Sequence, residues 1–294
     1  MTTSRTTAWL VPAMPRSRVA WLRIFLSGFV WLDVLVIRPW VRDHGSVPRS
    51  WYRPLAVADL LHLPAPTPTV TTVVMVVLLA ASAVAATGRL PRLAGIAVAC
   101  LYLEWMVIAF SYGKVDHDRF AFLVALAVLP TVGRATRDDD RPDEAAGWAI
   151  RSIQLAVVAT YLLSVAAKAR YGNGLTTWLD STTLVRAVVR RGTSLADPLL
   201  DVPSVLHAAQ YGIVALELLS PLVLLRGRVG RAMLVALLGF HLVTVATIGI
   251  LFHPHVMCLL AFLPLERLRQ FSSANRRARR RRSSSPAPGM ATRS

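Results

Sequence analysis

Four polar side chains recur along one apolar stretch near the middle of the chain. Spacings of seven, three and four residues separate Gln154, Tyr161, Ser164 and Lys168. Helical geometry places residues at these spacings on one face. A partly buried lysine loses its charge readily, so Lys168 could act as a base or bind an anion. The alternative is a lysine that reaches the membrane interface and keeps its charge in water.

Other polar groups stand in the apolar stretches that follow. His241, with Thr244 and Thr247 close behind it, could carry a proton or simply hydrogen-bond between helices. Gln210 and Glu217 are seven residues apart and share a helical face. Glu217 could therefore shape a pocket or form a structural ion pair.

Ionisable groups inside apolar helices are costly and usually face the interior of a bundle. The first apolar segment holds Arg23 and Asp33, and the third holds Glu104. We expect Arg23 to form a structural ion pair between helices, with Glu104 or Glu217.

A dense charged turn precedes the fourth segment. It consists of Lys114, Asp116, His117, Asp118 and Arg119. Two aspartates around a histidine could ligate a metal, and so could His253 with His255, but no nearby His or Cys pair completes a tetrahedral set. We expect no metal here, and a solvated, salt-bridged turn is the plainer interpretation.

These residues lie in a chain with the composition of a membrane protein. Of 294 residues 54% are hydrophobic and only 17% charged, against roughly 25% charged in soluble domains. The net charge is +17, but nine arginines and no acid fall in 267–294. Such a tail is typical of a solvated topology signal, not of a nucleic-acid surface, and we expect no nucleic-acid partner. Cys100 and Cys258 form no metal, haem or disulfide motif.

Eight apolar segments are long enough, or nearly so, to cross a bilayer. They are 19–37, 70–87, 93–111, 119–133, 151–168, 205–225, 232–251 and a short one at 256–265. The last follows a proline, so it is short, tilted or re-entrant. We predict an all-α, polytopic transmembrane helical bundle over 19–265, preceded by a cytoplasmic segment 1–18. A basic, disordered cytoplasmic tail over 266–294 follows.

An even number of segments puts both termini on one side, and the dense arginines near the short loops favour the cytoplasm. We therefore predict a multi-pass protein of the cell membrane with both termini inside. His117, Lys168 and the loop with Trp178 then meet at one outward mouth, with His241 beneath them. In the outer loop 169–204, an apolar face around Leu184 and Val188 predicts an amphipathic helix, on the membrane surface or packed over this mouth.

Several of these motifs have a familiar order. Tyr161-Leu-Leu-Ser-Val-Ala-Ala-Lys168, followed by Trp178, resembles the YxxAGxxK…W segment of the vitamin K-dependent gamma-carboxylase-like family, the HTTM (horizontally transferred transmembrane) domain. Glu217-Leu-Leu-Ser-Pro-Leu resembles the ExxxP helix of that family. The stretches around His117 and Phe240-His241, and the arginine at Arg23, fall at similar places in the chain.

The resemblance implies a catalytic role for Lys168 as the base, assisted by His117 and His241. It implies substrate-binding roles for Tyr161, Trp178 and Glu217, and a quinol such as menaquinol as the substrate or cofactor. After residue 265 the sequence continues only into the basic tail, so we expect the large lumenal region of the animal carboxylase to be missing. Asp-His-Asp replaces that family's Asn-His-Ser, and one lysine stands in place of two. Peptide gamma-carboxylation is therefore not expected.

Two hypotheses remain. The first is a membrane enzyme of lyase or oxygenase type that acts on a quinol-like or membrane-associated substrate at the outer mouth. The second is a non-catalytic membrane module for maturation, export or immunity of a partner peptide, similar to the membrane protein of the sporulation-delaying-toxin system. A transporter is a third reading, which the absence of internal repeats weakens.

Overall fold

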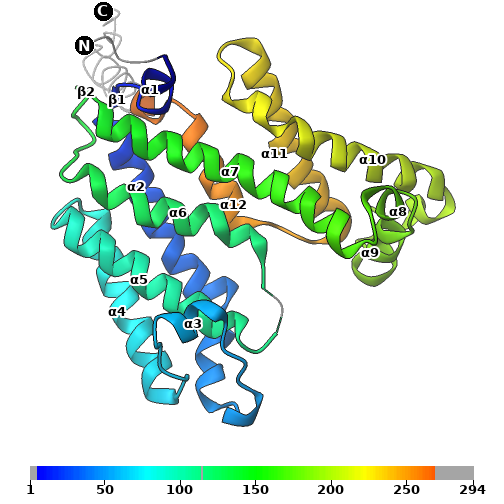
Figure 1. The fold of residues 1–294 in the computed structure, drawn as a ribbon, viewed down its shortest axis with the longest axis horizontal. Helices are drawn as coiled ribbons and strands as arrows, with labels where there is room; N and C mark the ends of the chain where they lie inside the picture. Colours follow the sequence, from blue (N-terminus) through cyan, green and yellow to red (C-terminus); the bar gives the residue numbers. More distant parts are fainter. Residues whose placement is uncertain (1–4, 114, 269–294) are drawn as a thin grey trace, which may run out of the picture.

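The computed structural model describes residues 5–113 and 115–268, and it forms the predicted all-α bundle (Figure 1). Lys114 and most of the predicted tail lie outside the described residues. A two-residue pairing between β1 (Met14–Pro15) and β2 (Pro142–Asp143) accompanies the helices. The helices are α1 Arg5–Leu10, α2 Arg16–Leu32, α3 Ala56–Leu60, α4 Pro68–Ala86, α5 Pro91–Phe110, α6 Phe120–Val128, α7 Glu144–Tyr171, α8 Leu175–Leu179, α9 Thr183–Arg191, α10 Pro203–Leu219, α11 Arg228–Ile248 and α12 His253–Cys258.

In the described part of the chain, six helices are long and apolar enough to cross a membrane. They are α2 with its π-helical extension to Ile37, α4, α5, α7, α10 with its 3-10 extension to Leu224, and α11. Two of the eight predicted segments are shorter. The last forms α12 and one 3-10 turn, as its short apolar stretch suggested. The fourth is only nine α-helical residues long and then a 3-10 turn containing Pro130. It packs against α5, α7 and α12.

The long helices begin where the sequence carries start signals. Pro68, Pro91 and Pro203 each occupy the first helical turn, where the missing amide hydrogen costs no bond. The Thr67 side chain accepts a hydrogen bond from Val70 N (3.2 Å), and Asp143 Oδ1 accepts one from Ala145 N (2.7 Å). These caps satisfy amides that the helix leaves unpaired and so fix where α4 and α7 begin.

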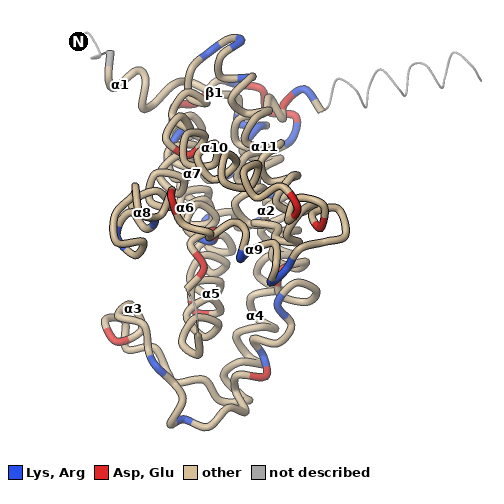
Figure 2. Tube along the Cα trace, turned by 90° about the vertical axis from the view of Figure 1, so that its right-hand side faces the viewer, with Lys and Arg blue, Asp and Glu red and all other residues tan. Residues whose placement is uncertain are grey.

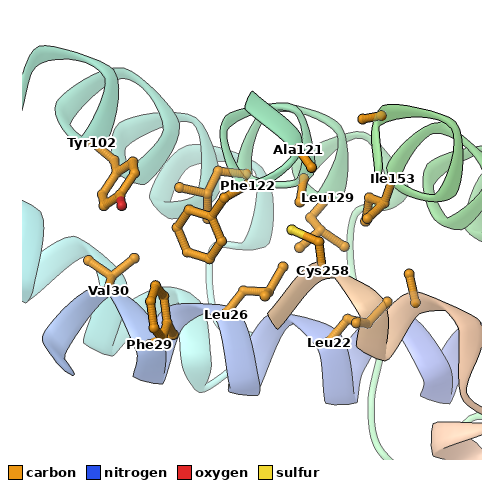
Figure 3. Close-up of a cluster of buried hydrophobic side chains, with 14 of the residues drawn as sticks. Leu22, Leu26, Phe29, Val30, Tyr102, Ala121, Phe122, Leu129, Ile153 and Cys258 are labelled. Atoms are coloured by element: carbon orange, nitrogen blue, oxygen red, sulfur yellow. The ribbon is translucent and has the colours of Figure 1, made fainter. Parts of the chain in front are cut away.

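The main core lies where α2, α5, α6, α7 and α12 meet (Figure 3). The Phe122 ring packs edge to face with Phe29 at 5.2 Å and with Tyr102 at 5.1 Å between centroids. Leu22 and Leu26 on α2 are completely buried in the same cluster. This packing fixes α6 in the bundle and with it the charged turn that precedes it.

Apolar side chains also cover much of the outside. On α4, Val73 and Val76 are each 54% exposed, and on α11 Leu242 is 70% exposed. Most charged residues, by contrast, lie in the connections and at helix ends (Figure 2). Long helices with apolar outer faces and satisfied backbones are the form that lipid requires. The chain is a membrane-helix-rich protein, and a lipid bilayer is its natural environment.

The described ends of the chain meet at one end of the bundle (Figure 1). Arg18 Nη2 lies 2.6 Å from Glu266 Oε1, and Arg16 donates a hydrogen bond to the carbonyl of Arg134. Both described ends and the segment before α7 therefore share one end. Which side of the membrane this end faces stays a prediction.

The expected ion pair of Arg23 with Glu104 or Glu217 is wrong. Arg23 Nη2 donates instead to the carbonyls of Gly133 (2.9 Å) and Leu129 (3.4 Å), just beyond α6. A helix end leaves carbonyls without partners, and α2 packs Arg23 against such an end. Glu217 has a different partner, as the next section shows.

Candidate functional site

A cavity of about 450 Å³ opens between α7, α9, α10, α11 and α12. Helices α8, α9 and α10 lie on the right-hand side of Figure 1. The cavity wall includes all six residues to which the resemblance assigns a catalytic or substrate-binding role. They are His117, Tyr161, Lys168, Trp178, Glu217 and His241. Five separate segments supply them, so only the packing of the bundle brings them together. The roles that the sequence suggested for them stay predictions.

Lys168 is held by several partners at once. Its Nζ lies 2.7 Å from Ser164 Oγ and 2.7 Å from each carboxylate oxygen of Glu217. The Trp178 ring lies beneath the ammonium, at 5.3 Å from its centroid. The Lys168 side chain is only 15% exposed, and that of Glu217 6%. Lys168 therefore faces the cavity with its charge balanced by that of Glu217, and this ion pair links α7 to α10.

Three aromatic side chains form the inner end of the cavity. The Tyr161 hydroxyl lies 2.8 Å from His241 Nε2, within hydrogen-bond distance. His255 packs edge to face on Tyr161 at 4.7 Å between centroids and lies 5.5 Å from the His241 ring. His255 is 2% exposed, and neither of its ring nitrogens has a hydrogen-bond partner among the described residues. His241 Nδ1 also lacks one. Three buried ring nitrogens beside this end of the cavity thus have no hydrogen-bond partner among the described residues.

The rest of the wall is almost entirely apolar. Ile213, Phe240 and Phe252 contribute to it. Gly249 ends α11 in the left-handed conformation (φ +64°), which a residue without Cβ adopts at little cost, and the chain turns back into α12. This turn returns Phe252 and His255 to the cavity. Such a lining favours a ligand that is mostly apolar.

His117 and Asp118 reach the cavity from the turn before α6. The His117 ring is exposed and lies 5.9 Å from the Phe252 ring. Asp118 is buried, and this burial raises the pKa of its carboxyl, an effect that the neighbouring Arg119 opposes. The turn thus places an aromatic base and a buried carboxyl at the cavity edge.

Neither weak metal motif is assembled into a ligand set. Among the described residues no group of three His, Cys, Asp or Glu side chains is arranged to hold a metal ion. His253 is not part of the cavity wall, whereas His255 is. Of the two histidines in this motif, only His255 contributes to the cavity wall, as a buried imidazole.

Two residues that the sequence reading left out of the site belong to it. The sequence suggests a role for His255 only as a metal ligand, but its two-residue spacing from His253 places the two side chains in different surroundings on a helix. Gln210 shares a helical face with Glu217, and this was the available signal. It is 1% exposed, and its Nε2 donates to the carbonyls of Trp178 (2.6 Å) and Leu179 (2.9 Å). Its Oε1 accepts from Leu184 N (3.0 Å), so Gln210 fastens α8 and α9 over the cavity.

The amphipathic helix predicted in the outer loop is α9. Val188 is buried, and Leu184 is partly buried against α10 and α11, whereas Val189 is 69% exposed. Thr193 N donates to the carbonyl of Thr247 and fixes the end of α9 to α11. The helix therefore packs over the mouth of the bundle.

Replacing Gln210 by leucine is expected to loosen α8 and α9 while the rest of the bundle stays folded. The leucine fills a similar volume but leaves the carbonyls and amide around it without partners, at about 1–3 kcal/mol. Hydrogen exchange of the amides in 175–191 should become faster. Gln154→Leu is the matched control, because Gln154 donates to Ala261 O near α12 and should leave 175–191 unchanged. Equal exchange in both variants would contradict the fastening role.

No protein-family model matches the chain, and no curated protein and no solved structure matches it either.

Proposed function

We propose that the cavity binds a lipid-soluble, quinol-like molecule and that the protein acts on it as an enzyme with Lys168 as the base. The observation that carries the proposal is the buried His255, with two unpartnered ring nitrogens, in an apolar cavity beside Tyr161 and His241. The motif resemblance to the HTTM family points to the same ligand class.

A buried polar group without a partner costs about 1–3 kcal/mol. An apolar solute alone would leave that cost in place at His255, whereas a ring that carries hydroxyl or carbonyl oxygens would remove it. A neutral imidazole has one donor and one acceptor nitrogen, and the hydroxyl of a quinol can pair with either of them. His241 presents a second unpartnered nitrogen nearby, so the inner end of the cavity suits the ring oxygens of a quinol.

A protonated lysine cannot accept a proton, so Lys168 must first give its proton to Glu217 before it can act as a base. Its Nζ lies 2.7 Å from Glu217 Oε1, which permits direct proton transfer. An apolar ligand that fills the cavity removes water from the pair and favours its neutral form. The proton then rests on Glu217, and the neutral amine of Lys168 takes the proton of the quinol hydroxyl. The products are a quinolate anion and the Lys168 ammonium, which stabilises it.

A second candidate is the non-catalytic membrane module for a partner peptide. The closed set of bonds among Lys168, Ser164 and Glu217 favours it, because that set is complete without a ligand. In either case we place the protein in the cell membrane with its arginine-rich end in the cytoplasm and the cavity outside.

Replacing His255 by phenylalanine is expected to weaken quinol binding about tenfold, the worth of one hydrogen bond to a buried group. The probe is a naphthoquinol with a short isoprenoid tail. It is titrated under argon into the full-length protein in nanodiscs, with calorimetric detection. The phenylalanine keeps the ring and removes two unsatisfied nitrogens, so we expect the protein to fold as before.

The control for this experiment is His207→Phe. His207 stands on α10, exposed and outside the cavity wall, so the same change there should leave binding unaltered. If the His255 variant binds the probe as tightly as the parent does, the cavity is not a quinol site. Absence of binding to the parent protein in this assay would have the same meaning.

A further inference from the structure

A second cavity, of about 1000 Å³, lies at the end of the bundle opposite the mouth. Its wall comes from α2, from the turn between α4 and α5, and from residues 134–138 before α7. The backbone of this turn closely approaches the 134–138 segment, since a Cβ on Gly88 would lie 3.5 Å from Ala135 O. Because α7 begins soon after this segment and Lys168 stands near its other end, the two cavities are separated by most of the length of that helix.

Positive charge dominates this wall. It contains the four arginines Arg23, Arg89, Arg134 and Arg137 and one acidic residue, Asp138. Arg89, Arg134 and Arg137 are exposed, and none of the three forms an ion pair with a described residue. Four arginines and one carboxylate leave an excess of positive charge in this wall, so an anion at its centre would be bound favourably.

Arg23 adds an independent observation. It is 4% exposed, and its Nη1 has no hydrogen-bond partner among the described residues, whereas Nη2 donates to Gly133 O. A guanidinium is permanently charged, and burying it without a carboxylate is costly. Its place in the wall supplies a fixed positive charge about two helical turns inside the end of α2.

Apolar side chains also line the wall. Ile24, Val84 and Leu90 contribute to it. Val84 and Leu90 are also exposed on the outer surface, at 39% and 62%. This apolar strip therefore lies beside the arginines and reaches the outer surface of the bundle. A small soluble anion would gain nothing from contact with these apolar side chains. A molecule with an anionic head and hydrocarbon chains would contact both the arginines and the apolar strip.

We propose that this cavity binds a phosphate group and that the apolar strip holds the acyl chains of the anionic membrane lipid that carries it. Arginines suit phosphate because their planar donors can bind two of its oxygens together. Basic pockets between transmembrane helices on the cytoplasmic side commonly bind lipid head groups. A lipid bound here would link α2 to the α4–α5 turn and to the segment before α7.

The test compares the full-length protein in nanodiscs of pure phosphatidylcholine with nanodiscs that contain phosphatidylglycerol. Native mass spectrometry of the released protein counts the phosphatidylglycerol that stays bound. We expect at least one retained molecule on the parent protein. The double variant Arg89→Gln with Arg134→Gln should bind it about 30-fold more weakly, since each arginine near the surface contributes about 1 kcal/mol. Both side chains are exposed, so the variant should fold.

The matched control is Arg226→Gln with Arg228→Gln, two exposed arginines outside the cavity wall. An equal loss in this control would reveal a general charge effect and overturn the proposal. Equal retention of phosphatidylcholine would also overturn it. Inorganic phosphate in the millimolar range forms a separate arm. If phosphate binds and the lipid does not, the cavity takes a free phosphate and the assignment to a lipid fails. None of these readouts depends on the quinol cavity.

Discussion

Replacing Asp33 by alanine is expected to lower the free energy of unfolding by about 3 kcal/mol, measured by denaturant titration of the protein in detergent micelles. Asp33 is completely buried, and its Oδ1 lies 2.6 Å from Nη1 of Arg119, which is 2% exposed. The Tyr102 hydroxyl donates to Asp33 Oδ2 (2.8 Å) and accepts from Arg119 Nη1 (2.6 Å). Loss of the carboxylate leaves a buried guanidinium without this partner.

The size of that effect follows from what remains. Breaking a buried ion pair costs about 3–5 kcal/mol, and Asp118 Oδ1 still lies 3.7 Å from Arg119 Nε. We therefore expect the lower end of the range. Tyr102→Phe keeps the ion pair and should cost only about 1 kcal/mol. Asp59→Ala applies the same substitution to an exposed aspartate and should change stability by less than about 0.5 kcal/mol. Similar losses for Asp33→Ala and Asp59→Ala would rule out a stabilising network.

The second large effect concerns Lys168 and rests on the proposed function. In the Lys168→Met variant, formation of quinolate from the bound naphthoquinol should slow by about 10²–10⁴-fold, the usual contribution of a general base. The measurement is the change in absorption spectrum on deprotonation, followed under argon after rapid mixing. Methionine has a similar length but no basic nitrogen, so the proton of the quinol hydroxyl has no acceptor at this position.

Two further variants separate a base from a structural charge. Lys168→Arg keeps the positive charge beside Glu217, but a guanidinium does not act as a base in proteins. It should retain stability and lose quinolate formation. In Lys168→Met with Glu217→Gln the buried charges are both removed, so stability should recover relative to Lys168→Met while quinolate formation stays lost. If Lys168→Arg forms quinolate at the parent rate, the lysine serves structure, and the non-catalytic module becomes the better account.

Several parts of this molecule follow from the sequence with little ambiguity. Long apolar segments bounded by prolines and by Thr67 or Asp143 can only be stable in lipid as helices, because lipid offers no partners for backbone amides. The face with Tyr161, Ser164 and Lys168 also follows, because spacings of three, four and seven residues return to one side of any helix. Gln154 lies on the same face but nearer the N-terminal end of α7, where its Nε2 donates a hydrogen bond to Ala261 O.

Pairings between helices did not follow. Each of Arg23, Lys168 and Arg119 had more than one available acid, and helix periodicity carries no information about which helix lies opposite. The prediction for Arg23 failed for this reason, since backbone carbonyls past α6 were nearer than any carboxylate. The sequence also did not reveal that α6 is short, because a short buried helix and a spanning helix are equally apolar.

The sequence by itself therefore determined an all-α membrane-helix bundle and the polar face of α7. It did so because hydrophobicity and helical periodicity act locally along the chain. Only the tertiary structure decided that Lys168 meets Glu217, that Gln210 fastens α8 and α9, and that His255 lies unpartnered beside His241. These contacts join residues that are far apart in the chain, and they depend on how the helices pack against one another.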